Sequence, residues 1–179
     1  MSTSISDGTW SFDPVHSSIG FRVKHLGVST FRGSFPGIQG AITTSGGAIT
    51  SIEGTVDMAS LNAQDDNLSG HLQSDDFFAV EAHPQGRFRS TSITSAPDGT
   101  LKIEGEITLR GIAKPLTLTG EVEGIGPDPY GGTRIGISAT GDLDRTAFGI
   151  TWNAPLANGL VAVSERVKLD WHLEGILAA

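Results

Sequence analysis

Glycine recurs at the inward positions of the strands that this sequence predicts. From Leu101 to Leu109 apolar residues alternate with polar ones, as in a half-buried strand, but position 105 of the apolar series is a glycine. Three other predicted strands omit one inward side chain in the same way, and the four glycines are Gly54, Gly105, Gly120 and Gly141. Glycine within a strand marks a tight bend in a barrel wall or a place where a ligand approaches the backbone. Both alternatives stay open, and both predict a curved sheet with room in its interior.

Composition favours a single all-β domain and excludes several classes of function. The chain has 179 residues, of which 24 are Gly and none is Cys. This glycine content favours strands and turns over helices, and the length suits one domain with a sizeable core. The net charge of −8 would repel a phosphate backbone, so we expect no nucleic-acid partner. The lack of cysteine excludes disulfides, thiolate metal sites and thiol catalysis.

Turn signals divide the chain into short strands and one helix. Clusters of Pro, Gly and Asp at 95–99 and 126–132 separate the alternating segments. A helix is predicted at about 63–78, because acidic residues at its start suit the helix dipole and Leu68 and Leu72 follow at helical spacing. The predicted strands lie near residues 10–12, 18–25, 31–35 (leading into 37–43), 48–60, 86–94, 100–110, 115–124, 133–144 and 160–176.

The first residues and the lengths of the apolar segments predict where the protein is found in the cell. Residues 1–8 are polar and lack the basic and apolar segments of a secretory signal, so we expect a cytoplasmic protein. No apolar segment approaches the roughly 18 residues needed to span a bilayer. We therefore expect a soluble protein with no transmembrane segment.

An ordered series of motifs runs through most of the chain. It begins with residues 10–29, which include Trp10, Asp13-Pro-Val-His16-Ser17, Phe21 and His25, and continues with Gly33-Ser-Phe35, the segment from His71 to Phe78, His83-Pro84 and the segment from Gly105 to Pro115. It ends with Asp128-Pro-Tyr-Gly-Gly132 and with Arg145 before Phe148-Gly149. Taken together, the series resembles the YceI-like family of bacterial lipid-binding proteins.

This resemblance implies a fold and a ligand class. The implied fold is a single domain over residues 1–179, an extended, lipocalin-like antiparallel β-barrel of about eight strands with one short helix near residues 63–78. The implied ligand is a polyisoprenoid or a similar long lipid held in an apolar lumen. Where members of the family commonly carry Arg-Asp before the His-Leu of the helix, this chain has Leu68-Ser69.

The candidate ligand-binding residues are mainly aromatic. These side chains are spread over several predicted strands and the helix, and they would converge only inside a barrel. Aromatic residues fill cores as well as pockets, so their presence alone does not separate the two. The missing side chains at the glycines favour a pocket. We predict a lumen lined by Phe21, Phe35, Gly54, Leu72, Phe77, Phe78, Phe88, Gly105, Gly120, Gly141, Phe148 and Trp152.

Catalytic and metal-binding interpretations find less support. Asp13, His16 and Ser17 suggest a hydrolase or isomerase acting on a lipid, but no strained nucleophile turn is present. The favoured interpretation is that they close the start of a strand through hydrogen bonds to the backbone or to each other. No two histidines have the close spacing of a zinc motif, so we expect neither a metal nor a cofactor. Asp75 and Asp76 are interpreted as capping or solvated residues.

The sequence thus predicts a binding protein without catalytic activity. Its ligand would be a long-chain isoprenoid lipid, an isoprenoid quinone or a polyprenyl phosphate, bound for storage or transport. Burial of the tail supplies about 0.8 kcal/mol per CH₂ before ordering costs, so no charged clamp is required. A tightly packed interaction protein without a cavity is the third alternative, and a homodimer is left open.

Overall fold

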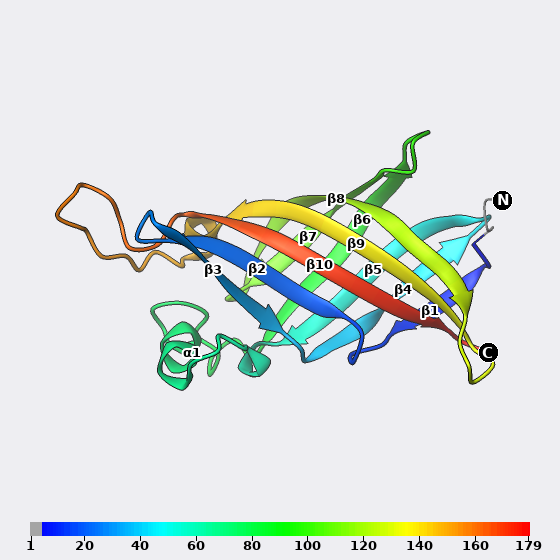
Figure 1. Cartoon of the computed structure of the whole chain (residues 1–179), viewed down its shortest axis with the longest axis horizontal. Helices are drawn as coiled ribbons and strands as arrows, with labels where there is room; N and C mark the ends of the chain where they lie inside the picture. The colour runs from blue at the N-terminus through cyan, green and yellow to red at the C-terminus, as the bar shows by residue number, and fades with distance from the viewer. Residues whose placement is uncertain (1–4) are drawn as a thin grey trace.

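The protein folds into one sheet of ten strands that closes on itself (Figure 1). The computed structural model describes residues 5–179. Neighbouring strands pair antiparallel from β4 to β10, and β1 pairs with both β4 and β10, which completes a ring of eight strands. The strands are β1 Gly8–Phe12, β2 Ser18–His25, β3 Ser29–Phe35, β4 Ile38–Ser45, β5 Ala48–Asp57, β6 Gln85–Ser95, β7 Leu101–Leu109, β8 Ile112–Pro127, β9 Thr133–Asp144 and β10 Arg166–Leu177. The predicted all-β barrel is confirmed.

The hairpin of β2 and β3 lengthens the barrel at one end. Strand β10 pairs with β1 through residues 175–177 and with β2 through residues 168–172. β1 and β2 therefore lie end to end along one edge of β10. β4 pairs with β1 and β3 pairs with β2, so β3 and β4 lie end to end in the next row. Within residues 5–179, β3 forms a ladder with β2 alone, so its second edge is open along Ser29–Gly33. The wall is incomplete at this place.

The connection from β5 to β6 covers the open side of the wall. It begins with the short 3₁₀ helix η1, Met58–Ser60, which replaces the end of the strand predicted at 48–60. Asn62 then bridges to Ser34 of β3, and the helix α1 follows at Asp66–Gln73. In Figure 1 this segment lies beside β3, at the end of the barrel away from the chain termini.

The helix α1 is shorter than predicted because both of its ends are capped by side chains. Asp65 precedes the helix, and its Oδ1 accepts a hydrogen bond from the Leu68 amide at 2.8 Å. The hydroxyl of Ser74 donates to the His71 carbonyl at 2.6 Å and ends it. Among residues 5–179, no helix has the length and apolar character required to cross a membrane.

The inward faces of the strands form a continuous apolar core. Trp10, Ile42 and Ile135 have no exposed surface, and Ile103, Leu118 and Ile137 are almost as completely buried. The Trp10 indole also donates to Thr44 Oγ1 at 2.9 Å, so its one polar atom is satisfied inside the core. These residues lie toward the end of the barrel formed by β1 and β4, and that half of the interior is filled with side chains.

Gly105, Gly120 and Gly141 do not leave empty space in the interior, which corrects our expectation for these three glycines. Gly54 does line the cavity described below, although an aromatic ring also packs against it. A Cβ on Gly105 would lie 2.5 Å from the Arg89 carbonyl oxygen and 2.5 Å from Cζ of Phe88. A Cβ on Gly120 would lie 2.4 Å from the Ser138 carbonyl oxygen. Glycine is needed at these positions because a neighbouring strand or an aromatic ring takes the place of a side chain, as in designed barrels where aromatic rings cover glycines.

Gly54 and Gly141 have close neighbours as well. A Cβ on Gly54 would lie 2.8 Å from the ring of Phe12, and one on Gly141 would lie 2.7 Å from Cδ2 of Leu118. Of the two explanations offered by the sequence, the structure favours tight curvature of the wall at these positions.

Candidate ligand cavity

A cavity of about 480 Å³ occupies the half of the barrel next to α1. Its walls come from every strand except β8, from η1, from α1 and the turn after it, and from Arg145 and the segment 150–163. Most of the lining is aliphatic or aromatic, with Ile19, Val56, Leu109, Leu143, Val167 and Leu169 among the aliphatic residues. A mainly apolar cavity of this size is the usual form of a small-molecule site in a protein.

Two groups of aromatic rings concentrate at this cavity. Phe21 and Phe35, from β2 and β3, have ring centroids 5.8 Å apart. Phe78 packs edge-on against both rings, at 6.3 Å from Phe21 and 5.5 Å from Phe35. The second group is formed by Phe77 and Trp152, 5.4 Å apart, and each lies 5.0 Å from the His71 ring. The structure brings these five residues, which are distant in the chain, together at the cavity.

The predicted lumen residues divide into two sets. Those that line the cavity are Phe21, Phe35, Gly54, Leu72, Phe77, Phe78, Phe88 and Trp152. Gly105, Gly120, Gly141 and Phe148 lie outside the lining. Phe148 is 2% exposed in the 3₁₀ helix η2, Arg145–Phe148, where it belongs to the packed core.

The cavity reaches the surface at the β2–β3 hairpin. Lys24, His25, Ser29 and Thr30 all line the cavity and are exposed to solvent. Side chains on β2 alternate in direction, so His25 shares the inward direction of Phe21 and Val23. Ser29 is paired with His25 across the hairpin. Four polar residues of the lining are thus placed where the cavity opens.

Among residues 5–179, Arg145 is the one strongly buried charged side chain that lines the cavity, and its hydrogen bonds go to carbonyl groups. It is 4% exposed. Its guanidinium donates to Ile150 and Trp152 at 2.8 and 2.9 Å through Nη1, and to Ser164 at 2.9 Å through Nε. Burial lowers the pKa of Arg145, and the nearby charges of Glu165 and Asp144 oppose that shift. Arg145 therefore fixes the segment 150–164, which forms one wall of the cavity.

Arg110 fixes a second part of the cavity wall. Its Nη1 donates to the carbonyl oxygens of Asp75 and Phe77, at 2.8 and 2.6 Å. This holds the turn after α1 against the β7–β8 hairpin, and it places Phe77 and Phe78 in the cavity. The carboxylate of Asp76 lies 3.0 Å from Nε2 of His71, so it supports a ring that lines the cavity rather than capping the helix.

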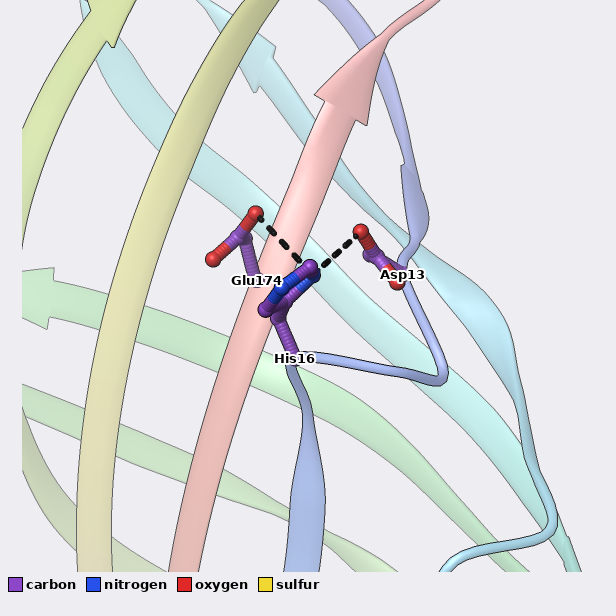
Figure 2. Close-up of side chains that lie close together, drawn as sticks. All are labelled: Asp13, His16 and Glu174. Carbon is purple, nitrogen blue, oxygen red and sulfur yellow. Dashed lines mark hydrogen bonds and ion pairs between the residues drawn. The ribbon is translucent and has the colours of Figure 1, made fainter. Parts of the chain in front are cut away.

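The residues suspected of catalysis lie in the turn between β1 and β2, where they form a separate network with side chains of β9 and β10. Nδ1 of His16 lies 2.9 Å from Asp13 Oδ2. A dashed line marks this interaction in Figure 2. Arg134 Nη1 donates to the same Asp13 oxygen at 2.6 Å and also to Glu174. These hydrogen bonds, from His16 and then from Arg134, hold the pKa of Asp13 well below its usual value. The hydrogen bonds that Arg134 donates to Asp13 and, next in size, to Glu174 raise the pKa of Arg134.

Ser17 is not part of a catalytic chain in this network. Its Oγ accepts a hydrogen bond from the Glu174 amide at 2.9 Å and donates to the Glu174 carbonyl at 3.3 Å. In the described part of the chain, no hydrogen bond joins Ser17 to His16. The prediction that Asp13, His16 and Ser17 close the start of a strand through hydrogen bonds is confirmed, and the structure gives no support to the alternative of a lipid hydrolase or isomerase.

The sequence did not reveal the partners of this network. Asp13, His16 and Glu174 each present a possible metal ligand, and these atoms lie within 4.8 Å of one another (Figure 2). The guanidinium of Arg134 already donates to both carboxylates, so the geometry fits an ion-pair network. Glu174 and Arg134 are far from Asp13 in the chain, and only the closure of β10 on β1 brings them together.

A closed antiparallel barrel with an apolar interior cavity is the architecture that lipocalin-like binding proteins use for one small ligand. Within that class, residues 10–175 match the family model of the YceI-like domain, and the chain belongs to this family. The resemblance seen in the sequence motifs is confirmed.

Known relatives cover most of the chain. A UPF0312 protein of Vibrio cholerae is 32% identical over 163 residues, which is 90% of this chain and 82% of that protein. A UPF0312 protein of Pseudomonas putida has the same identity and covers 90% of this chain and 81% of its own length.

Solved structures share the fold. BcnA of Burkholderia cenocepacia has a TM-score of 0.78 at 21% identity and covers 91% of this chain and 98% of its own. The YCEI protein of Campylobacter jejuni has a TM-score of 0.75 at 25% identity, covering 87% and 90%. A polyisoprenoid binding domain from Saccharophagus degradans has a TM-score of 0.73 at 14% identity, covering 97% and 100%.

Proposed function

We propose that this protein binds one long-chain apolar lipid in the barrel, and that the lipid is a polyisoprenoid such as an isoprenoid quinone or a polyprenyl phosphate. The observation that carries this proposal is the cavity of about 480 Å³ lined by the two aromatic groups around Phe78 and Trp152. Membership in the YceI-like family supports it, as does the shared fold of the polyisoprenoid binding domain from Saccharophagus degradans.

The physical driving force is burial of the tail. Each CH₂ removed from water contributes about 0.8 kcal/mol before ordering costs are subtracted, so a tail of some ten carbons binds without a charged clamp. The flat, branched units of an isoprenoid fit against rings such as Phe21, Phe35 and Phe78, which line the cavity. Phe88 and Leu72 close the cavity from the β6 and α1 sides.

The polar head of the ligand belongs at the β2–β3 hairpin. His25 and Ser29 line the cavity there and are exposed. Deeper in the cavity, Arg145 has committed its Nε and Nη1 donors to carbonyl groups. Desolvating a head group in the deep part would leave it without partners, at a cost that the hairpin end avoids.

The proposal is one of binding for storage or transport, with no catalytic step. The arrangement of Ser17 and His16 supports this, because Ser17 Oγ is hydrogen-bonded to the backbone of Glu174. Incubation with isoprenoid esters tests it: we expect no hydrolysis, and ester cleavage that His16→Ala abolishes would replace binding by catalysis. The cytoplasmic location and the homodimer stay predictions, to be tested by cell fractionation and by light scattering.

Native mass spectrometry of the protein purified under mild conditions tests the ligand directly. We expect one bound lipid per chain, with a mass that identifies its length and head group. The purified protein should also take up an added isoprenoid quinone at one per barrel, and the quinone should quench the fluorescence of Trp152 and Trp171, which line the cavity. Failure of a folded sample to bind any long-chain apolar compound would overturn the proposal.

A variant that fills the cavity provides the matched comparison. Val23 lines the cavity from β2, so Val23→Trp should abolish quinone uptake while the barrel stays folded. Val15 is 82% exposed and lies outside the lining, so Val15→Trp should bind quinone like the parent protein. Equal binding by both variants would show that the quinone occupies another site.

A further inference from the structure

The end of the barrel where the cavity opens carries an exposed apolar tip. It consists of the turn between β2 and β3 and the loop 154–162. Val28 is 79% exposed, Leu160 47% and Val161 46%. Figure 1 shows the two segments together at the end opposite the chain termini. Exposed aliphatic side chains grouped in this way, rather than scattered singly, mark a surface that contacts a partner or a membrane.

The tip is held in this exposed arrangement by backbone hydrogen bonds. The Leu26 amide donates to the Ala162 carbonyl at 2.8 Å, which joins the hairpin turn to the loop. Within the loop, the Leu156 amide donates to the Leu160 carbonyl at 2.8 Å, and Pro155 bridges to Val161. These contacts keep Leu160 and Val161 from folding back against the barrel.

Charge around the tip differs from charge in the rest of the protein. The chain carries 20 acidic residues, yet the segments 24–30 and 150–164 contain none, and Lys24 is the one Lys or Arg in them. Just behind the tip, Arg32, Arg22 and Lys168 occupy one register line across β3, β2 and β10. Among the described residues, none of these three forms an ion pair; the nearest acidic position in that line is Asp142, opposite Lys168 on β9.

This row of cations is unfavourable in the isolated protein. Like charges directly opposite each other on neighbouring strands repel, and Arg22 has a cation on both sides. The buried Nε of Arg22 also lacks a hydrogen-bond partner within residues 5–179. Arg166 lies on the same face of β10 as Lys168, and its Nη1 is 3.6 Å from Asp142 Oδ1. Asp170 lies on that face too, two residues after Lys168 and farther from the tip. An anionic surface placed against the row would supply the missing counter-charge.

We infer that the protein docks on an anionic lipid bilayer through this end, with Val28, Leu160 and Val161 inserted among the lipids and Arg22, Arg32 and Lys168 facing the head groups. This inference rests on the proposed function, because docking here places the opening beside His25 and Ser29 at the membrane surface. A long lipid tail then passes from the bilayer into the cavity without crossing water. The combination of an apolar tip with adjacent basic residues is how peripheral proteins bind anionic membranes.

Vesicle sedimentation tests the inference with the full chain. We compare vesicles of phosphatidylcholine alone with vesicles that also contain phosphatidylglycerol, and expect sedimentation with the second kind that weakens as salt is raised. Arg22→Gln combined with Arg32→Gln should lower partitioning about 25-fold, since each cation near an anionic surface contributes about fivefold. Arg89→Gln combined with Lys102→Gln removes the same charge from β6 and β7 and should leave partitioning unchanged.

The apolar contribution has its own variants. Val28→Asp combined with Leu160→Asp should abolish sedimentation with the vesicles that contain phosphatidylglycerol. Tyr130→Asp is the control, because Tyr130 is 90% exposed in the β8–β9 turn, at the other end of the barrel (Figure 1). Circular dichroism confirms that each variant is folded.

Three results would overturn the inference: no sedimentation of the parent protein with anionic vesicles, equal sedimentation of tip and control variants, or light scattering that shows the tip joining two copies of the chain. Quinone binding in solution is measured on every variant. If the parent protein binds quinone but not vesicles, docking is wrong and the proposed function stands. If it does not bind quinone, the proposed function fails independently.

Discussion

The ring of Phe88 covers Gly105 on the inner wall of the barrel. Its Cζ lies 2.5 Å from the position that a Cβ on Gly105 would occupy. The same ring packs edge-on against Trp171, with centroids 5.2 Å apart. Phe12 covers Gly40 and Gly54 in a similar way, and Phe21 covers Gly33. The inward glycines and the aromatic rings are thus two halves of one packing arrangement, in which a ring lies flat against the wall because the residue beneath it has no side chain.

Gly105→Ala should therefore destabilise the barrel. The new methyl group would overlap the Phe88 ring and the Arg89 carbonyl oxygen, and overpacking of a filled core costs about 1 to 3 kcal/mol. Urea denaturation measures the free energy of unfolding. The control is Gly124→Ala in β8, where no atom lies within 4 Å of the new methyl group. It should be neutral or stabilise by up to about 1 kcal/mol. Equal effects of the two substitutions would contradict this explanation.

Gly120→Leu tests whether position 120 belongs to a packed wall or faces an open lumen. The added side chain would begin 2.4 Å from the Ser138 carbonyl oxygen, so we expect a large fall in melting temperature. Gly120 does not line the cavity, and the quinone affinity of the folded fraction should be unchanged. Both quantities are measured on one sample by calorimetry and native mass spectrometry. Retained stability with lost affinity would show instead that position 120 faces ligand space.

Much of the fold could be predicted because strand patterns are local. The alternation at 101–109 and 133–144 gave the strands β7 and β9 to within a residue. The last strand begins at Arg166 rather than at residue 160, because the loop 154–162 pairs with itself between Pro155 and Val161. Such pairing depends on loop geometry, and the apolar residues of the loop resemble those of a strand.

The contents of the barrel could be predicted less well. A glycine at an inward position indicates that a side chain is missing, but the sequence does not tell whether a neighbouring ring fills the place. Gly105 and Phe88 meet only because β6 and β7 pair in one particular register. Likewise, Asp13 meets Glu174 through the pairing of β1 with β10, and that closure is set by the whole barrel. The convergence of Phe21, Phe35 and Phe88 could be expected from the sequence, because an inward Phe on any strand of a barrel points at the same axis.

Arg110→Gln should loosen the wall of the cavity that carries Phe77 and Phe78. Arg110 donates to the carbonyl oxygens of Asp75 and Phe77, and the variant lacks the charged donor. We expect local opening to become about 1 kcal/mol easier, which gives roughly fivefold faster hydrogen exchange at the amides of residues 77–79. Lys114→Gln, at an exposed position of β8, is the control. Unchanged exchange in Arg110→Gln would show that the rings alone hold this turn.

Asp13 should make the stability of the barrel depend on acidic pH. Hydrogen bonds from His16 and Arg134 keep the pKa of Asp13 below its ordinary value of 3.8. The unfolded chain therefore takes up a proton at this carboxylate more readily than the folded protein does. The stabilisation is present above the ordinary pKa and is lost as pH falls below it. Asp128 belongs to the same network, and the amides of Gly132 and Tyr130, followed by Arg134, lower its pKa as well.

Asp13→Asn tests this dependence. The variant cannot carry the charge that Arg134 and His16 stabilise, so it should melt lower than the parent protein at about pH 7, and the difference should shrink toward about pH 3. Melting temperatures across this range measure the effect. Asp142→Asn, which removes an exposed carboxylate from the outer face of β9, should give a small difference that varies little with pH. A constant gap between Asp13→Asn and the parent protein at every pH would mean that Asp13 stabilises the barrel through hydrogen-bond geometry alone, with no contribution from its charge.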